Sequence, residues 1–232
     1  KHLKTMHSMQ NPVACSKSLA EDLENKYRIR TIAIQNGVDT EIYRPASSEE
    51  KIRLREKLGL DKDEKYFLTV GSLIPRKNTI TLLHAFRKYS GGHLLILGDG
   101  TEKEKLIESA QGAKSIHFKG NVSNANEYMK AADFYLSAST GEGLPNTVLE
   151  AISSGLPVGL SDIRPHREVF SDVNYFYFFP PRNVGSLIEL INKIEQGNQG
   201  ILRKKMRETA ENYFSAKFMA AKYQELYFKL LS

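Results

Sequence analysis

The chain has 232 residues, of which 41% are hydrophobic and 26% are charged, an ordinary balance for a globular protein. Its single cysteine, Cys15, excludes an internal disulfide framework, and no apolar run approaches the roughly 20 residues that a membrane-spanning helix needs. The net charge of +6 is spread along the chain without a recurring basic and aromatic pattern, so we expect no nucleic-acid partner. We expect a cytoplasmic protein. Its basic side chains either lie on solvated helix faces or attract the protein peripherally to anionic lipid at the inner face of a membrane.

The first 44 residues have the pattern of part of a domain. Apolar runs at 12–15 and 30–35 flank a helical pattern at 17–26, which predicts one strand–helix–strand unit, and the turn Asn36-Gly37-Val38-Asp39 follows it. One such unit cannot bury both faces of its own sheet. We therefore interpret residues 1–44 as a remnant of an N-terminal domain with its linker, and expect most of that domain to lie outside this chain. A further helix is predicted at 50–58.

From residue 66 onward, short apolar runs alternate with helical patterns. This alternation predicts βαβ units and a parallel sheet with helices on both faces, and strands that are apolar throughout suit burial on both sides. The predicted fold class is α/β, a Rossmann-like doubly wound parallel sheet in a domain that spans residues 45–214. The predicted strands are 66–73, 93–97, 115–118, 133–138, 157–160 and 175–179, and the predicted helices are 78–89, 102–110, 124–131, 145–154, 165–170, 183–196 and 201–213.

Residues 215–232 have the pattern of an amphipathic helix at the C-terminal end. Its apolar side chains lie mainly on one side: Phe218, Ala221, Leu226, Tyr227, Leu230 and Leu231. An apolar surface of this kind needs a partner. We expect the helix to pack toward the N-terminal domain, with a dimer contact as the alternative.

Four loops follow predicted strands, at 71–77, 98–100, 120–123 and 140–147, and ligands of such sheets bind at the carboxyl ends of the strands. The first loop carries Arg76 and Lys77 directly before a helix. These two cations could neutralise a diphosphate, with a solvated basic loop as the alternative. The third loop could present its backbone to the edge of a base, with Val122 packing on the ring.

The segment 141–151, GEGLPNTVLEA, places two carboxylates eight positions apart. Glu142 lies in a loop, and Glu150 lies on the helix that follows, among apolar neighbours where an unpartnered carboxylate would be unfavourable. The N-terminus of that helix suits a phosphate or sugar oxygen, whereas carboxylates accept hydrogen bonds from hydroxyl groups. We therefore expect this segment to bind a ligand that carries both phosphate and sugar. A salt bridge or cap contact is the structural alternative for Glu150.

Other chemistries find little support in the sequence. The six histidines show no metal-ligand spacing and the carboxylates form no cluster, so no metal site is predicted. The phosphate-binding pattern G-x-x-x-x-G-K-[ST] is absent, and no serine has the surroundings of a hydrolase nucleophile.

Together these segments resemble the family-4 retaining glycosyltransferases of the GT-B fold. Residues 142–150 resemble the E-x7-E motif of that family in its G-E-G-x-P form, and 34–39 with Arg44-Pro45 resemble its interdomain linker. The stretches 70–77, 82–86, 97–100 and 118–122 match further blocks in the expected order, and Cys15-Ser16-Lys17 resembles the last part of the N-terminal domain. The similarity covers nearly the whole chain. It identifies the Rossmann-like domain as the C-terminal, donor-binding half of a GT-B fold.

The resemblance implies a donor sugar linked to UDP or GDP. It makes Lys77 and Glu142 the catalytic residues: Lys77 would hold the diphosphate and help the leaving group, and Glu142 would bind hydroxyls of the sugar. Glu150 would bind the ribose. Further donor-binding residues would be Ser72, Arg76, Val122 and the backbone of Gly143, Leu144, Asn146 and Thr147. Ser72 stands where the family commonly has an arginine, for which Arg76 is a candidate substitute.

The implied activity is transfer of a sugar from the nucleotide to a glycan or lipid-linked acceptor, with retention of configuration and without a metal or other cofactor. A non-catalytic nucleotide-sugar-binding or scaffolding subunit is the alternative, motivated by Ser72. A related GT-B epimerase or phosphorylase is a third hypothesis. Because the acceptor site of such enzymes lies mainly on the N-terminal domain, we expect this chain alone to bind donor weakly and to transfer little or nothing.

Overall fold

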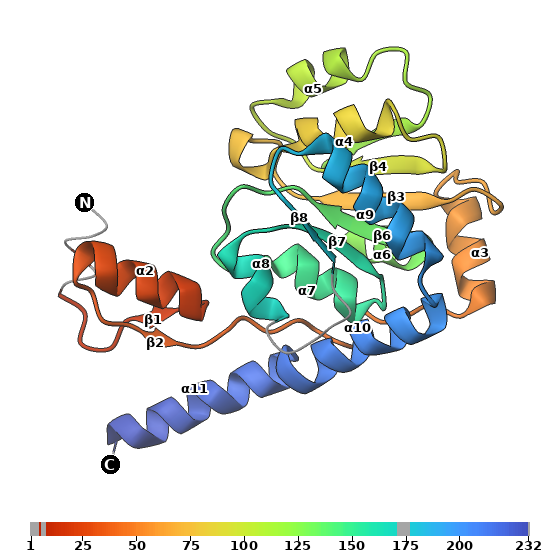
Figure 1. Ribbon diagram of the computed structural model, residues 1–232. Coiled ribbons are helices and arrows are strands. Elements are labelled where there is room, and N and C mark those ends of the chain that lie inside the picture. Colours follow the sequence, from red (N-terminus) through yellow and green to blue (C-terminus); the bar gives the residue numbers. More distant parts are fainter. Residues whose placement is uncertain (1–4, 6–7, 171–176, 232) are drawn as a thin grey trace.

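The computed structural model describes residues 5, 8–170 and 177–231. Its centre is a six-stranded sheet in which neighbouring strands run parallel, in the order β5-β4-β3-β6-β7-β8 (Figure 1). The strands are β3 (Tyr66–Val70), β4 (His93–Leu97), β5 (Ile116–Gly120), β6 (Phe134–Ser137), β7 (Val158–Ser161) and β8 (Tyr177–Phe179). The chain runs outward from β3 to β5 and then returns to place β6 on the other side of β3. The carboxyl ends of β3 and β6 therefore flank the point where the strand order reverses.

Helices cover both faces of this sheet, as predicted. Alternate strand residues point to opposite faces, so Tyr66 and Leu68 join one apolar cluster while Phe67 joins the other. The first cluster is completed by α6 (Ala125–Ala131), α7 (Asn146–Ser153), α8 (Arg164–Val169) and α10 (Gln199–Tyr213), and the second by α4 (Thr79–Phe86), α5 (Lys103–Ser109) and α9 (Val184–Gln196). The predicted α/β class with a doubly wound parallel sheet is confirmed.

Several element boundaries differ from the prediction by a few residues. The predicted helix 78–89 is α4, which begins at Thr79 because Asn78 has a left-handed backbone (φ 51°) that separates α4 from the short 3-10 helix η1 (Pro75–Lys77). Helix α10 begins two residues earlier than predicted because the Asn198 side chain caps it by accepting a hydrogen bond from the Ile201 N–H. Positions 175 and 176 of the last predicted strand lie outside the described residues.

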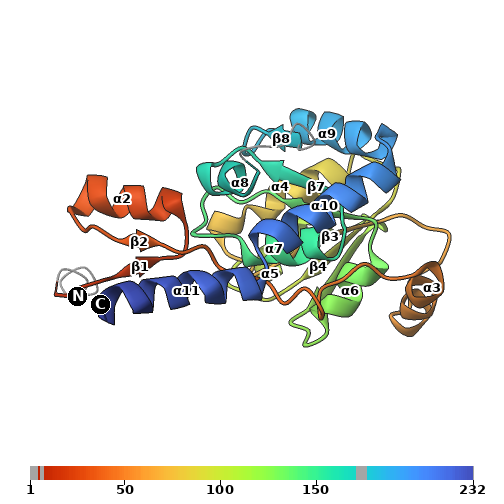
Figure 2. The ribbon, with the colours of Figure 1, turned by 90° about the horizontal axis from the view of Figure 1, so that it is seen from below.

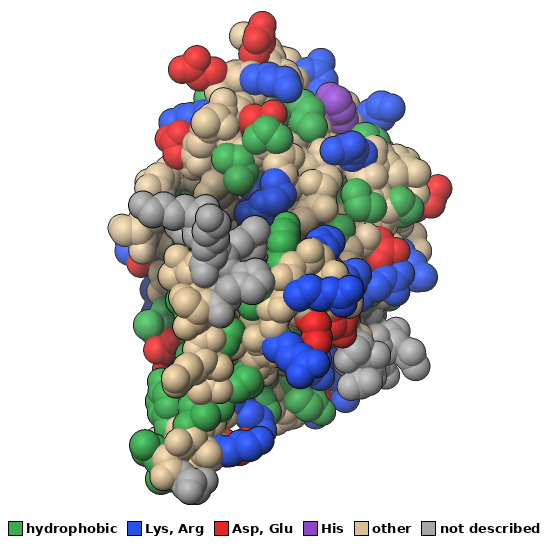
Figure 3. Space-filling view, turned by 90° about the vertical axis from the view of Figure 1, so that its left-hand side faces the viewer, with side chains coloured by type: hydrophobic (Ala, Val, Ile, Leu, Met, Phe, Trp, Pro, Cys, Tyr) green, Lys and Arg blue, Asp and Glu red, His purple; other side chains and the backbone are tan. Residues whose placement is uncertain are grey.

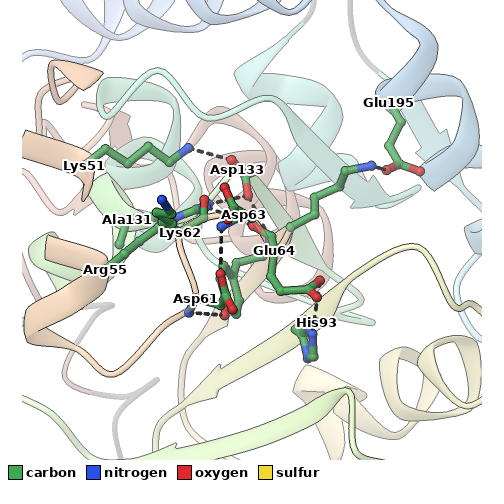
Figure 4. A network of polar contacts seen from close by, with 12 residues as sticks. Lys51, Arg55, Asp61, Lys62, Asp63, Glu64, His93, Ala131, Asp133 and Glu195 are labelled. Carbon is green, nitrogen blue, oxygen red and sulfur yellow. Dashed lines mark hydrogen bonds and ion pairs between the residues drawn. The ribbon is translucent and has the colours of Figure 1, made fainter. Parts of the chain in front are cut away.

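A charge network fixes α3 (Ser48–Lys57) to the amino end of the sheet (Figure 4). Lys51 Nζ lies 2.5 Å and Arg55 Nη2 2.7 Å from the two oxygens of Asp133, which also accepts a hydrogen bond from the Tyr66 N–H. Burial raises the pKa of Asp133, but Lys51, Arg55 and the Tyr66 amide outweigh it and hold the pKa below its usual value. Asp133 thereby joins a helix to two neighbouring strands.

The terminal segments lie together beside this sheet. Strands β1 (Val13–Ala14) and β2 (Ile32–Ala33) form a parallel two-stranded sheet with α2 (Lys17–Tyr27), and α11 (Ala216–Leu231) runs alongside them (Figures 1 and 2). The predicted strands at 12–15 and 30–35 are therefore present but only two residues long. Glu168 on α8 accepts hydrogen bonds from the Lys17 and Ser18 N–H groups at 2.7 and 2.9 Å. A carboxylate of the larger unit thus binds the N-terminus of α2, where a negative charge is favourable.

The two connections to these terminal segments cross at one place. The Val38 N–H donates to Phe214 O at 2.7 Å, and the Ala216 N–H donates to Val38 O at 2.9 Å. Gly37 is required at this crossing, because a Cβ there would lie 2.6 Å from Ala216 Cα. Beyond the crossing, α11 leaves Phe228 and Leu231 75% and 86% exposed. That this helix packs toward an N-terminal domain stays a prediction.

Candidate functional site

The predicted loops meet at the carboxyl ends of β3, β4, β5 and β6. A cavity of about 260 Å³ opens there, lined by Val70, Gly71, Ser72, Leu97, Gly98, Asp99, Asn121, Val122 and Ala125. A neighbouring hollow contains Ser72 and Lys77 together with Ser137, Ala138 and Ser139 from the end of β6. Figure 3 views the molecule from this side, where Lys and Arg side chains gather over the middle of the face.

Glu142 lies between these loops and is paired with both predicted cations. Its side chain is only 7% exposed, and its carboxylate lies 2.7 Å from Lys77 Nζ and 3.0 Å from Arg76 Nη1. The Ser139 hydroxyl also donates to it at 2.7 Å. Burial raises the pKa of Glu142, but the hydrogen bonds from Lys77 and Ser139 and the charge of Arg76 outweigh it, so the net pKa is lowered. Glu142 is therefore an ionised acceptor that holds two cations at the end of β3.

Arg76 reaches this position from the other end of its loop. Its Nη1 donates to Gly141 O at 2.5 Å as well as to Glu142, and its side chain is about half exposed. Ser72 is exposed and lines both hollows, but its side chain is uncharged. The structure thus brings Arg76 beside Lys77, on the same carboxylate.

Glu150 lies on α7, one turn beyond its start. Burial raises its pKa, and a hydrogen bond from the Tyr43 phenol opposes that shift. Burial and the charge of Glu150 in turn raise the pKa of Tyr43. Unlike Glu142, Glu150 has no cationic partner among the interactions that shift its pKa. It is a half-buried carboxylate able to accept hydrogen bonds from a ligand.

The charges of Glu142 and Glu150 both affect the pKa of the buried Tyr135 phenol. The Tyr135 hydroxyl donates to Thr147 Oγ1 at 2.8 Å. Burial raises the pKa of Tyr135, and the negative charges of Glu150 and Glu142 raise it further. The two glutamates therefore lie near the same side chain of β6.

The start of α7 lies between the two glutamates. No side chain caps this helix, and Pro145 occupies its N-cap position. The first N–H groups of any helix lack intrahelical acceptors, so those of Asn146 and Thr147 are free for a ligand oxygen. Leu144 is buried in the core, which leaves only its backbone for binding, and Asn146 accepts a side-chain hydrogen bond from Asn36 at 2.9 Å.

The larger cavity depends on close backbone contact between two loops. A Cβ at Gly98 would lie 1.9 Å from Gly71 O, and Gly98 has a φ of +134°, so only glycine fits. Val122 is partly buried against the core beside Asn121 and completes the far wall. The predicted base-contacting loop therefore does line a cavity. This cavity adjoins the neighbouring hollow, because Ser72 and Gly71 line both.

Sequence reasoning missed the side chains that support these residues. Ser139 hydrogen-bonds Glu142 and Tyr43 hydrogen-bonds Glu150, whereas Tyr135 and His166 lie close enough for the charge of a glutamate to shift their pKa values. Ser139 follows a predicted strand at the same sheet edge, which could have drawn attention to it. Tyr43 is 107 positions from Glu150, and nothing in the sequence connects the two.

The described ranges contain no group of three His, Cys, Asp or Glu side chains arranged to hold a metal ion. The prediction of metal independence stays a prediction. In the part of the chain that the structure describes, no helix is long and apolar enough to cross a bilayer.

Residues 50–213 match the family model described as "Glycosyl transferases group 1". This chain belongs to that family. Among its relatives, the alpha-monoglucosyldiacylglycerol synthase of Streptococcus pneumoniae is 30% identical over 218 residues, which are 87% of this chain and 49% of that protein. The UDP-Gal:alpha-D-GlcNAc-diphosphoundecaprenol alpha-1,3-galactosyltransferase of Escherichia coli is 28% identical over 210 residues, 85% of this chain and 54% of that one. The chain thus spans about half the length of these curated relatives.

Solved structures of other proteins share the fold. The Anabaena protein HepE in complex with UDP and glucose superposes with a TM-score of 0.84 at 19% identity, over 92% of this chain and 61% of that one. These neighbours are GT-B proteins, so the GT-B glycosyltransferase resemblance is confirmed at the level of superfamily and fold.

Proposed function

We propose that this chain is the donor-binding part of a retaining glycosyltransferase that uses a UDP- or GDP-linked sugar. The observation that carries the proposal is the arrangement at the start of α7. Glu142 holds two cations, whereas Glu150 pairs with no cation among the described residues. The uncapped N–H groups at the start of α7 lie between them in the sequence. Cations and a helix start suit a diphosphate, and free carboxylate oxygens suit sugar hydroxyls.

Each residue has a role in this proposal. Lys77 and Arg76 exchange part of their contact with Glu142 for the diphosphate, and Lys77 stabilises the charge that develops on the leaving group. Arg76 thereby takes the role of the arginine that the family commonly has at the position of Ser72. Glu142 and the backbone from Gly143 to Thr147 hold the sugar, and Glu150 binds the ribose. The base enters the cavity beside Val122. These charges offset the diphosphate without a metal ion.

A glycan or lipid-linked acceptor fits the relatives, one of which is named for a monoglucosyldiacylglycerol product and another for a diphosphoundecaprenol-linked substrate. We further propose that residues 1–44 are the end of an acceptor domain, that 45–214 are the donor domain, and that 215–232 pack back toward the acceptor domain. The protein would then work in the cytoplasm, peripherally at the inner face of the membrane. This chain alone would transfer little, because the acceptor domain lies outside it.

Calorimetric titration with UDP and with GDP tests the proposal, with Glu150→Ala as the site variant. We expect one nucleotide to bind and Glu150→Ala to weaken it at least tenfold, because the ribose loses a charged acceptor. Glu189→Ala, a substitution on α9 away from these loops, is the matched control. Absence of binding to both nucleotides would refute the proposal. Binding without donor turnover by the full-length protein would favour the non-catalytic alternative.

A further inference from the structure

Four polar side chains are buried directly behind Glu142. Ser137 ends β6, Ser161 ends β7, Ser139 follows β6 and His166 lies on α8. His166 and Ser161 are 0% exposed, and Ser139 is 1% exposed. Burying several polar groups among apolar side chains is unfavourable unless each is hydrogen-bonded. Their grouping at the ends of adjacent strands, on the side of the candidate site, therefore needs a reason.

These side chains form a connected set that ends on Glu142. His166 Nδ1 lies 2.8 Å from Ser161 O, and the Ser161 hydroxyl donates to Ser139 O at 2.5 Å. His166 Nε2 lies 3.4 Å from Ser137 Oγ, which is also 3.4 Å from Ser139 Oγ. The Ser139 hydroxyl donates to Glu142 Oε1 at 2.7 Å. The imidazole is thus connected to the Ser139 backbone through Ser161, and the Ser139 hydroxyl holds the carboxylate. The single proton of the Ser137 hydroxyl serves either His166 Nε2 or Ser139 Oγ, so Ser137 adds no second continuous route.

The protonation of His166 suits this role. A neutral imidazole has one donor and one acceptor, so Nδ1–H can donate to the Ser161 carbonyl while Nε2 accepts from the Ser137 hydroxyl. Burial lowers the pKa of His166 to about 4, although the Ser161 carbonyl and Glu142 oppose the shift and Lys77 adds to it. The ring is therefore neutral at physiological pH and adds no positive charge beside the cations of the site.

We propose that His166, acting through Ser161, and Ser139, acting directly, are positioning residues that set the place of the Glu142 carboxylate for the donor sugar. This inference rests on the proposed function. Without the network, Arg76 and Lys77 alone would hold the Glu142 carboxylate. The carboxylate would then move with these cations when they bind a diphosphate. Ser139 gives Glu142 an anchor that does not depend on Arg76 or Lys77.

The test compares nucleotide with nucleotide sugar. Calorimetry with UDP, UDP-glucose, GDP and GDP-mannose measures the ratio of the two dissociation constants within each pair. We expect Ser139→Ala and His166→Leu to weaken the sugar nucleotide about tenfold, which equals about 1.4 kcal/mol, while the free nucleotide changes less than about twofold. His166→Gln keeps a donor and an acceptor and should restore most of the affinity. Equal weakening of nucleotide and sugar nucleotide would overturn the inference.

A matched control and a second measurement complete the test. Ser154 is buried at 3% exposure, and its hydroxyl has no hydrogen-bond partner among the residues that the structure describes, so Ser154→Ala should change neither dissociation constant. Hydrogen exchange of residues 139–144 should quicken in Ser139→Ala but not in Ser154→Ala. Unchanged exchange would overturn the inference without touching the proposed function. If wild-type protein binds no nucleotide, the proposed function fails and this inference fails with it.

Discussion

Acid should destabilise this protein through His166. Its imidazole is fully buried, and burial lowers its pKa to about 4 from an ordinary value of 6.5. Between these two values the unfolded chain binds a proton that the folded chain does not. The stability that depends on a neutral His166 is therefore complete above about pH 6.5 and is lost progressively as the pH falls toward 4.

The size of this effect follows from the two pKa values. A difference of about 2.5 units corresponds to about 3 kcal/mol at the acid limit. At about pH 5 the unfolded chain is largely protonated at this site and the folded chain is not, which gives a loss of about 2 kcal/mol. For a domain of marginal stability, this is a large fraction of the free energy of unfolding.

Urea unfolding followed by circular dichroism, at about pH 7.5 and about pH 5, measures this loss. Burial and the neighbouring His93 also lower the pKa of His117, and other groups titrate too, so the wild-type change alone is not diagnostic. The comparison is with His166→Gln, which should lose about 2 kcal/mol less over this range. His84→Gln, an exposed position on α4, should behave as wild type. Equal losses in wild type and His166→Gln would refute the reasoning.

Three further results are expected. Asp133→Asn should lower the free energy of unfolding in urea by about 3 kcal/mol, because Lys51 and Arg55 lose their buried counter-charge. Since burial raises the pKa of Glu150, nucleotide affinity measured by calorimetry should fall as the pH is lowered from about 7.5 to 5, because a protonated carboxyl accepts hydroxyl hydrogen bonds less well. Gly98→Ala should lower stability in urea by more than about 2 kcal/mol, because its Cβ would overlap the Gly71 carbonyl.

Each of these has its own control. Asp162→Asn removes an exposed pair with Arg167 and should change stability by less than about 1 kcal/mol; a loss as large as that of Asp133→Asn would contradict the network. Glu150→Gln should remove the pH dependence of affinity, and a slope equal to that of wild type would point to another group. Gly112→Ala has the same unfavourable sign of φ with open space around it, so a loss equal to that of Gly98→Ala would show that strain, rather than overlap, is responsible.

Local pattern was sufficient for most of the fold. Strands β4 and β6 are continuous apolar runs because both of their faces are buried. Helix α7 ends before Gly155 because that glycine has a positive φ of +73°. Both signals lie within a few neighbouring residues and can be recognised in the sequence. The predicted start of α4 is within one residue of the observed start, whereas its predicted end at residue 89 lies three residues beyond the observed end at Phe86. The short lengths of β1 and β2 could not be predicted, because strand length depends on the partner strands.

The candidate site was predictable only in part. Lys77, Arg76 and Glu142 stand out in the sequence, yet their mutual pairing across 65 positions comes from the return of the chain to β6 beside β3. Ser139 carries only the weak signal of its place after a predicted strand, and His166 carries none, because serine and histidine at strand ends and helix starts are common. Their connection appears only when β6, β7 and α8 are packed together.

The crossing at Gly37 has a mechanical consequence. A single extended connection can twist freely, but here two connections are joined by reciprocal hydrogen bonds at Val38, and the absent side chain of Gly37 lets them touch. The β1–α2–β2 segment and α11 are therefore joined to each other at this crossing, while Glu168 attaches the start of α2 to α8 of the large unit. A larger side chain at position 37 would therefore loosen the attachment of both segments at once rather than of one alone.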